Sequence, residues 1–170
     1  MLDLVKMGRG AVISAVASLI LACSGGGPDQ QLAQAEEVLR QAASDTTKAE
    51  IAVKQVAAFV DGYPSHPGAA GALKQLAMLR QQRGNLTGAI AEYERLLTIY
   101  PESEFADEAQ FMIGFIYEEH LQDYPAARVA YQLVVDKYPG SELAANAERL
   151  LPHVGRPPEE WVRFQDEETP

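Results

Sequence analysis

Cysteine, histidine and tryptophan are scarce in this sequence, and basic residues are outnumbered. Its 170 residues include one cysteine, three histidines and one tryptophan, with 14 Lys and Arg against 24 Asp and Glu. One cysteine cannot close an internal disulfide, so the fold has no disulfide framework. The net charge of −10 argues against nonspecific binding to nucleic acid and against docking on anionic lipid, since both need clustered Lys and Arg.

Motifs that carry catalytic chemistry are also missing. His66, His120 and His153 stand apart, and none belongs to a His-x-x-x-His or Glu-x-x-His arrangement. No glycine loop has the spacing of a phosphate cradle. We therefore predict that the protein is not an enzyme and uses no metal and no cofactor.

The apolar run at residues 11–22 ends at the single cysteine, and Lys6 and Arg9 precede it. The run is too short to cross roughly 30 Å of hydrocarbon as a helix, which takes about 20 residues. A basic start followed by a short apolar segment is typical of a secretory signal peptide. An uncleaved anchor and a secreted protein without lipid are the alternatives.

The end of this signal departs from the usual Ala-x-Ala. Ile20-Leu21-Ala22-Cys23 resembles the lipobox of bacterial lipoproteins. The resemblance implies a diacylglycerol on the Cys23 thiol, cleavage before Cys23 and an N-acyl chain such as palmitate on the new amino terminus. Two or more acyl chains anchor a protein firmly, because each buried methylene contributes about 0.8 kcal/mol. Ser24 rather than Asp follows Cys23, which favours the outer membrane, facing the periplasm.

Four segments follow from composition. We predict a signal peptide at 1–22, a lipidated cysteine with a flexible tether at 23–31, a helical repeat domain at 32–155, and a capping helix with an acidic tail at 156–170. In the last segment Trp161 is predicted to cover the end of the helical stack, since terminal repeats need a cap. A partner site at Trp161 is the alternative.

A recurring Tyr-Pro phrase divides the repeat domain. It starts at Tyr63, Tyr100 and Tyr138, at intervals of 37 and 38 residues. A fixed period of this size indicates a solenoid of helix pairs. Because proline disfavours helix at the residue before it, each phrase is predicted to end a helix at its tyrosine.

Other residues predict where helices begin and end. Gly84 suits the left-handed conformation that ends many helices. Thr47 with Glu50 fits a capping box. Side chains that can cap the start of a helix are found at Asn85, Ser103, Asp123 and Ser141.

Small and aromatic residues recur at fixed places within the period. One unit has Ala77, Gly84, Ala89, Tyr93 and Pro101; the next has Gly114, Tyr117, Ala127, Tyr131 and Pro139. This pattern resembles the tetratricopeptide repeat (TPR), and a poorer first unit has Ala52, Phe59 and Pro64. The resemblance implies an all-α fold, a right-handed α-solenoid of about three TPR-like helix pairs with a C-terminal capping helix.

The longer period is similar to the TPR segments of two envelope proteins, the Tol-Pal cell-division coordinator and the lipoprotein of the β-barrel assembly machinery. In TPR proteins the first helix of each pair lines the inner wall. By that analogy the candidate partner-binding groove comprises Lys74, Met78, Gln81, Glu108, Phe111, Phe115 and Glu118.

The resemblance implies a lipid-anchored periplasmic scaffold that binds proteins or peptides in outer-membrane assembly or cell-division coordination, and that binds no nucleic acid. The alternative is an accessory lipoprotein subunit of a secretion or surface-structure apparatus.

Overall fold

The structure is a computed structural model that describes residues 26–157 and residue 160. The signal peptide, Cys23 and Trp161 lie outside these residues. The regular structure described is helical throughout, in the order α2 (Pro28–Ala42), η2 (Thr46–Lys48), α3 (Ala49–Gly62), α4 (Ala69–Gln82), α5 (Leu86–Ile99), α6 (Ala106–Phe115), η3 (Ile116–His120), α7 (Tyr124–Lys137) and α8 (Glu142–Leu150).

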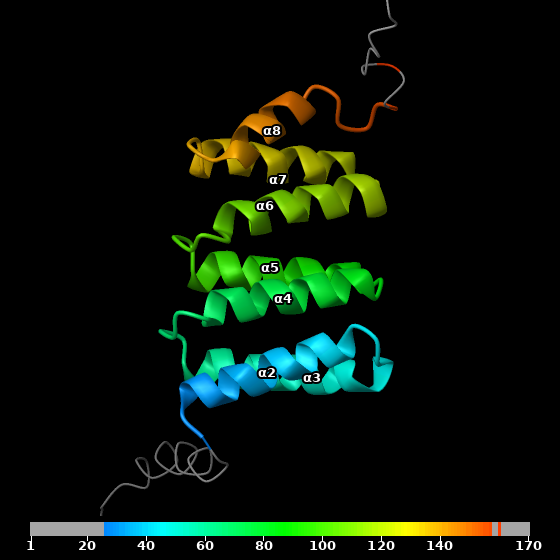
Figure 1. The fold of residues 1–170 in the computed structure, drawn as a ribbon. Helices are drawn as coiled ribbons and strands as arrows, with labels where there is room; N and C mark the ends of the chain where they lie inside the picture. The colour runs from blue at the N-terminus through cyan, green and yellow to red at the C-terminus, as the bar shows by residue number, and fades with distance from the viewer. Residues whose placement is uncertain (1–25, 158–159, 161–170) are drawn as a thin grey trace, which may run out of the picture.

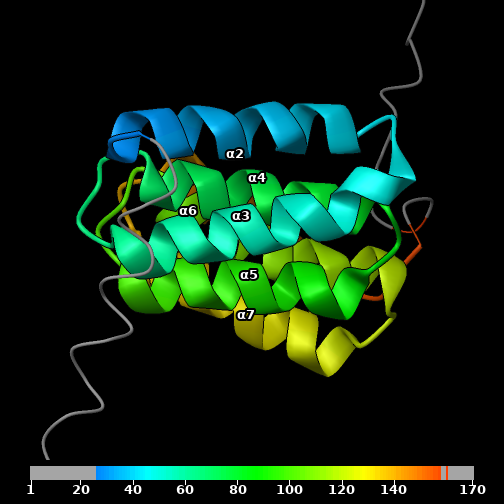
Figure 2. The same cartoon turned by 90° about the horizontal axis from the view of Figure 1, so that it is seen from below.

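The helices form a stack of three pairs, α2 with α3, α4 with α5 and α6 with α7, and α8 lies on the last pair (Figure 1). Seen along the stack, α2, α4 and α6 follow one another on one side, and α3, α5 and α7 on the other (Figure 2). This arrangement confirms the predicted α-solenoid of helix pairs. The capping helix predicted at 156–170 lies mostly outside the described residues, and α8 is a separate helix that precedes it.

The three Tyr-Pro phrases end their helices as predicted. α3, α5 and α7 each stop one residue before the tyrosine. The tyrosine N–H still donates to the carbonyl four residues earlier, and proline then prevents a further helical turn. The three bonds join Tyr63 to Phe59, Tyr100 to Leu96, and Tyr138 to Val134.

Three of the predicted N-caps are confirmed. The side chains of Asn85, Asp123 and Ser141 each accept a hydrogen bond from the backbone N–H three residues later, at 3.0, 3.1 and 3.0 Å. These bonds satisfy N–H groups that the first turn of a helix leaves without a partner. Gly84 has φ +74°, as its predicted place after α4 requires.

Two other caps are wrong. Thr47 does not cap α3, because its N–H (2.9 Å) and hydroxyl (2.6 Å) both donate to the Asp45 carboxylate. A short η2 turn therefore precedes α3. Ser103 lies in a turn, where its hydroxyl accepts a hydrogen bond from the Phe105 N–H (3.2 Å), and α6 begins only at Ala106.

The predicted tether at 23–31 is shorter than expected, because α2 already begins at Pro28. Proline is well suited to the first turn of a helix, where its missing N–H would have no partner. Backbone bonds from Gln30 and Gln31 to the Gly27 carbonyl fix this start.

The core combines aliphatic and aromatic side chains with small residues at the places where helices cross. Ala77, Ala89 and Ala127 are fully buried. Gly114 of α6 is so close to Tyr131 of α7 that a Cβ atom added at Gly114 would lie 2.7 Å from two ring carbons. A side chain at position 114 would therefore force the two helices apart or move the ring.

We predict that Gly114→Ala destabilises the protein by about 1–3 kcal/mol, because overpacking outweighs the gain in helix propensity. Gly71→Ala is the matched control within α4, since its Cβ would meet the nearest Phe105 ring carbon at 3.4 Å, an ordinary contact. This control is expected to be neutral or stabilising. Urea unfolding followed by circular dichroism measures both, and equal effects would contradict the tight crossing.

Candidate interaction surface

The first helices of the pairs, α2, α4 and α6, form one side of the stack, which we call the A face (Figure 2). We call the side formed by α3, α5 and α7 the B face. The resemblance predicted that partner contacts lie on the first helices, hence on the A face.

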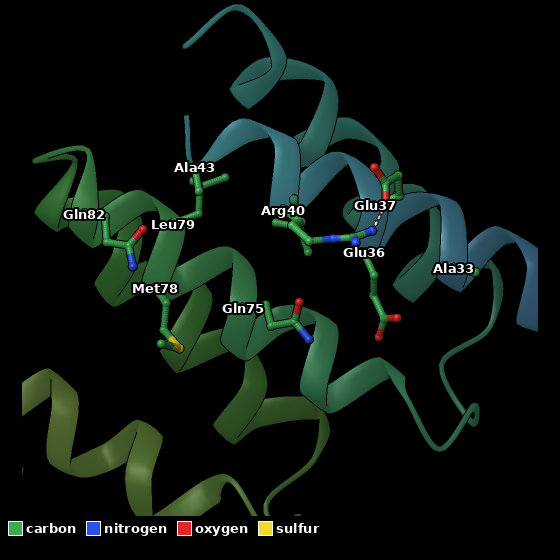
Figure 3. Close-up of a pocket in the computed structure, with 10 residues that line it drawn as sticks. Ala33, Glu36, Glu37, Arg40, Ala43, Gln75, Met78, Leu79 and Gln82 are labelled. Carbon is green, nitrogen blue, oxygen red and sulfur yellow. Dashed lines mark ion pairs between the residues drawn. The ribbon is translucent and has the colours of Figure 1, made fainter. Parts of the chain in front are cut away.

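A groove of about 620 Å³ lies on this face between α2 and α4 (Figure 3). Leu39 and Leu79 are buried beneath it, while Met78 is 40% exposed. The rest of the lining mixes alanines with polar side chains, and Arg40 is paired to Glu37 along α2. We call this the A-face groove; polar side chains along it come from Glu36, Glu37, Arg40, Gln75 and Gln82.

Of the predicted groove residues, Met78 lines this groove, and Gln81 is half-buried on the same helix. Lys74 instead joins α4 to α6. Its ammonium lies 2.8 Å from Glu108 Oε2 and 4.4 Å from the centre of the Phe105 ring. The structure therefore brings Lys74 and Glu108 together as an ion pair between neighbouring repeats.

The other predicted residues of α6 and η3 contact the rest of the last repeat. The Phe111 ring lies 5.1 Å from that of Tyr131, and the Phe115 ring 5.6 Å from that of His120. Glu118 accepts hydrogen bonds from the Tyr131 hydroxyl (3.0 Å) and from the Gly155 N–H (3.4 Å). Their part in partner binding stays a prediction.

The groove predicted from the sequence omitted α2 and two amides of α4, Gln75 and Gln82, which line the A-face groove. The first unit has few repeat marks, so no inner face was assigned to residues 28–42. Gln75, Met78 and Gln82 are spaced three and four residues apart, which places them on one face of a helix. That spacing was the available signal.

Tyr93 and Tyr131 occupy equivalent places in successive repeats and are each 1% exposed. Burial, together with the negative charge of Glu108, raises the pKa of Tyr93 to about 12. Burial, and then the neighbouring Glu118, also raises the pKa of Tyr131 well above its usual value. The Tyr93 hydroxyl has no hydrogen-bond partner among the described residues, whereas Tyr131 donates to Glu118.

The tetratricopeptide-repeat family model matches residues 72–103 and 108–141. These segments take in most of α4 with α5, and all but the start of α6 with α7. The match supports a tetratricopeptide-repeat protein and a protein–protein interaction scaffold, and proteins of this class are generally non-catalytic. A comparison with curated proteins found no match.

The described residues contain neither a cluster of metal ligands nor a membrane-spanning helix. No three His, Cys, Asp or Glu side chains in this part of the chain are placed to hold a metal ion. None of the helices described has both the length and the apolar character needed to cross a bilayer.

We predict opposite outcomes for two tyrosine variants. Tyr131→Phe removes one of the two donors to Glu118 and is expected to cost about 1.5–3 kcal/mol, typical of a hydrogen bond to a charged group. Tyr93→Phe removes a buried hydroxyl without a described partner and is expected to be neutral or stabilising. Urea unfolding at pH 7 measures both, and a larger loss for Tyr93→Phe would contradict this assignment.

The raised pKa values also predict a loss of stability at alkaline pH. Above pH 10 the unfolded chain gives up its tyrosine protons while the folded protein retains them, so the free energy of unfolding falls as pH rises towards the folded values. Urea midpoints between pH 9 and 11 measure this fall. It is expected to be shallower in Tyr131→Phe; an equal slope would show that Tyr131 does not contribute.

Proposed function

We propose that the protein is a lipid-anchored scaffold of the bacterial envelope, facing the periplasm from the outer membrane, whose A face binds proteins or peptides. The repeats support the scaffold role, and the lipobox-like segment at Cys23 supports the anchor. The observation that carries the proposal is the open A-face groove on a stack of TPR helix pairs.

The chemistry of this groove suits a polypeptide. Amide side chains such as Gln75 and Gln82 both donate and accept hydrogen bonds, so they can pair with a peptide backbone. Met78 adds a flexible apolar contact that adapts to different side chains. The partner we propose is therefore a peptide segment that places an apolar residue on Met78.

The anchor and the stack are close in sequence. Only residues 24 and 25 separate Cys23 from Gly26, the first described residue. Three residue steps extend to at most about 11 Å. An acylated Cys23 therefore keeps Gly26, two residues before the start of α2, within about 11 Å of the anchor point.

The process we propose is outer-membrane assembly or cell-division coordination, on the similarity to the TPR segments noted above. A photo-crosslinking residue at Gln82 in intact cells tests it, with the exposed Lys54 of α3 as the control position. Crosslinks to barrel-assembly components would support assembly, and crosslinks to Tol-Pal or septal wall enzymes would support coordination. Capture of secretion subunits would favour the alternative, and no Gln82-specific crosslink would count against the A face.

We predict that Cys23→Ala abolishes metabolic labelling with radioactive palmitate and moves the protein from the membrane to the soluble fraction. Cys23 is the only thiol in the chain, so the variant removes the proposed acylation site without touching the repeats. Circular dichroism of the purified variant checks that the helices are intact. Labelling that persisted in Cys23→Ala would overturn the lipoprotein proposal.

A further inference from the structure

A second groove, of about 610 Å³, lies on the B face between α5 and α7, above α6. We call it the B-face groove. Its lining is mainly apolar, with Leu97 from α5, Ile113 and Tyr117 from α6 and η3, and Val129 and Leu133 from α7. Val129 is 63% exposed, the most exposed large apolar side chain among the described residues. An apolar groove of this volume is typical of a binding site.

The preceding repeat shows why this groove is unusual for the stack. There, two ion pairs join the equivalent helices: Arg95 of α5 to Asp61 of α3 at 2.5 Å, and Arg80 of α4 to Glu92 of α5 at 3.1 Å. These pairs link α3 to α5 and α4 to α5 at the surface.

One period later, none of the four charges recurs. The positions 37 or 38 residues on are Thr98 for Asp61, Leu133 for Arg95, Tyr117 for Arg80 and Ala130 for Glu92. All four of these residues line the B-face groove. Positions that form ion pairs between helices in one repeat are therefore uncharged in the next, where they line the groove.

The floor of the groove is held in place by the protein itself. Gln110 of α6 is 5% exposed, and its side-chain N–H donates to the Ala130 carbonyl of α7 at 3.2 Å. A buried amide with a partner across two helices fixes their spacing. The groove is thus formed before any partner arrives, which lowers the entropic cost of binding.

Two charges on the lining indicate what the groove accepts. Glu94 of α5 and Lys137 at the end of α7 both line it, and neither forms an ion pair with another described residue. Lining residues of α7 extend from Ala126 to Lys137, which is about 17 Å of helix, or three turns.

We propose that the B-face groove binds an amphipathic helix of a partner protein, about three turns long, with an apolar stripe on Val129 and Leu133, a basic residue at Glu94 and an acidic residue at Lys137. Helix-in-groove binding uses such a stripe of residues at helical spacing. The inference rests on the proposed scaffold role, but it depends neither on the lipid anchor nor on the A-face groove.

The test uses the purified full chain in detergent and a fluorescent helical peptide of about 14 residues, roughly four turns, with leucines every three to four positions. One Arg and one Glu stand about five residues apart near its middle, because Glu94 is equivalent to position 132 of α7, five residues before Lys137. A peptide of the same composition with scrambled leucines is the reference. Anisotropy titration against a protein-free blank is expected to show binding of the first peptide and at least tenfold weaker binding of the reference.

Val129→Asp is expected to weaken peptide binding at least tenfold, since a carboxylate would be placed against the apolar stripe. Val129 is exposed, so folding is not at risk, and circular dichroism checks this. Ile51→Asp, a change at an exposed apolar residue of α3 that lines neither groove, is expected to leave the Kd within twofold. If the Gln82 crosslinks fail, the proposed A-face function fails, but the peptide affinity of the B-face groove is not affected. The two proposals can therefore be contradicted separately.

Charge reversal tests the orientation of the proposed helix. Glu94→Lys and Lys137→Glu are each expected to weaken binding about threefold at low salt, as exposed pairs of up to about 1 kcal/mol allow. The double variant is expected to restore it, because the peptide can then dock in the opposite direction. Restoration would support both charge contacts, and additive weakening would overturn them.

Three results would overturn the proposal. One is equal binding of the ordered and scrambled peptides, and another is unchanged binding to Val129→Asp. The third is binding only after residues 161–170 are removed, or a dimer seen by sedimentation that Val129→Asp breaks. That result would assign the groove to the chain's own end or to a second copy.

Discussion

The close approach of the two helices in each pair holds the stack together. In the second and third pairs it depends on a small residue facing an aromatic ring, as Gly114 faces Tyr131 with no room for a Cβ atom. The preceding repeat has Ala77 and Tyr93, both buried, at the equivalent positions. With this crossing fixed, the Tyr-Pro phrase ends the second helix and the next pair can begin. Two rows of helices, and hence an A face and a B face, follow from its repetition (Figure 2).

The same crossing determines which surface residues are left for partners. Tyr131 reaches the A side of the stack and donates to Glu118, while Phe111 packs on its ring. Lys74 and Glu108 join the neighbouring repeats. These residues were expected to face a partner, yet each also stabilises the stack. Between α2 and α4 the groove lining is instead set by Met78 and by amides with no such internal role.

Local signals in the sequence predicted the fold well. The Tyr-Pro phrases, Gly84 and the caps at Asn85 and Asp123 act within four residues, so they could be found without the structure. Thr47 failed as a cap because its own N–H and hydroxyl donate to Asp45, two residues earlier. Contacts across repeats were out of reach: Lys74 and Glu108 are 34 residues apart, and nothing in either helix alone shows that they meet.

Departures from the repeat, rather than the repeat itself, distinguish the two faces of this protein. Because the small–aromatic crossing fixes the backbone, surface positions such as Arg95 and its equivalent Leu133 can differ without changing the fold. The first takes part in an ion pair between helices, and the second lines an open apolar groove. When both partners of an ion pair are replaced, no unpaired charge is left behind, so the replacement costs little stability. Comparing equivalent positions of successive repeats therefore locates a candidate binding surface that motif searches, which look for what repeats have in common, pass over.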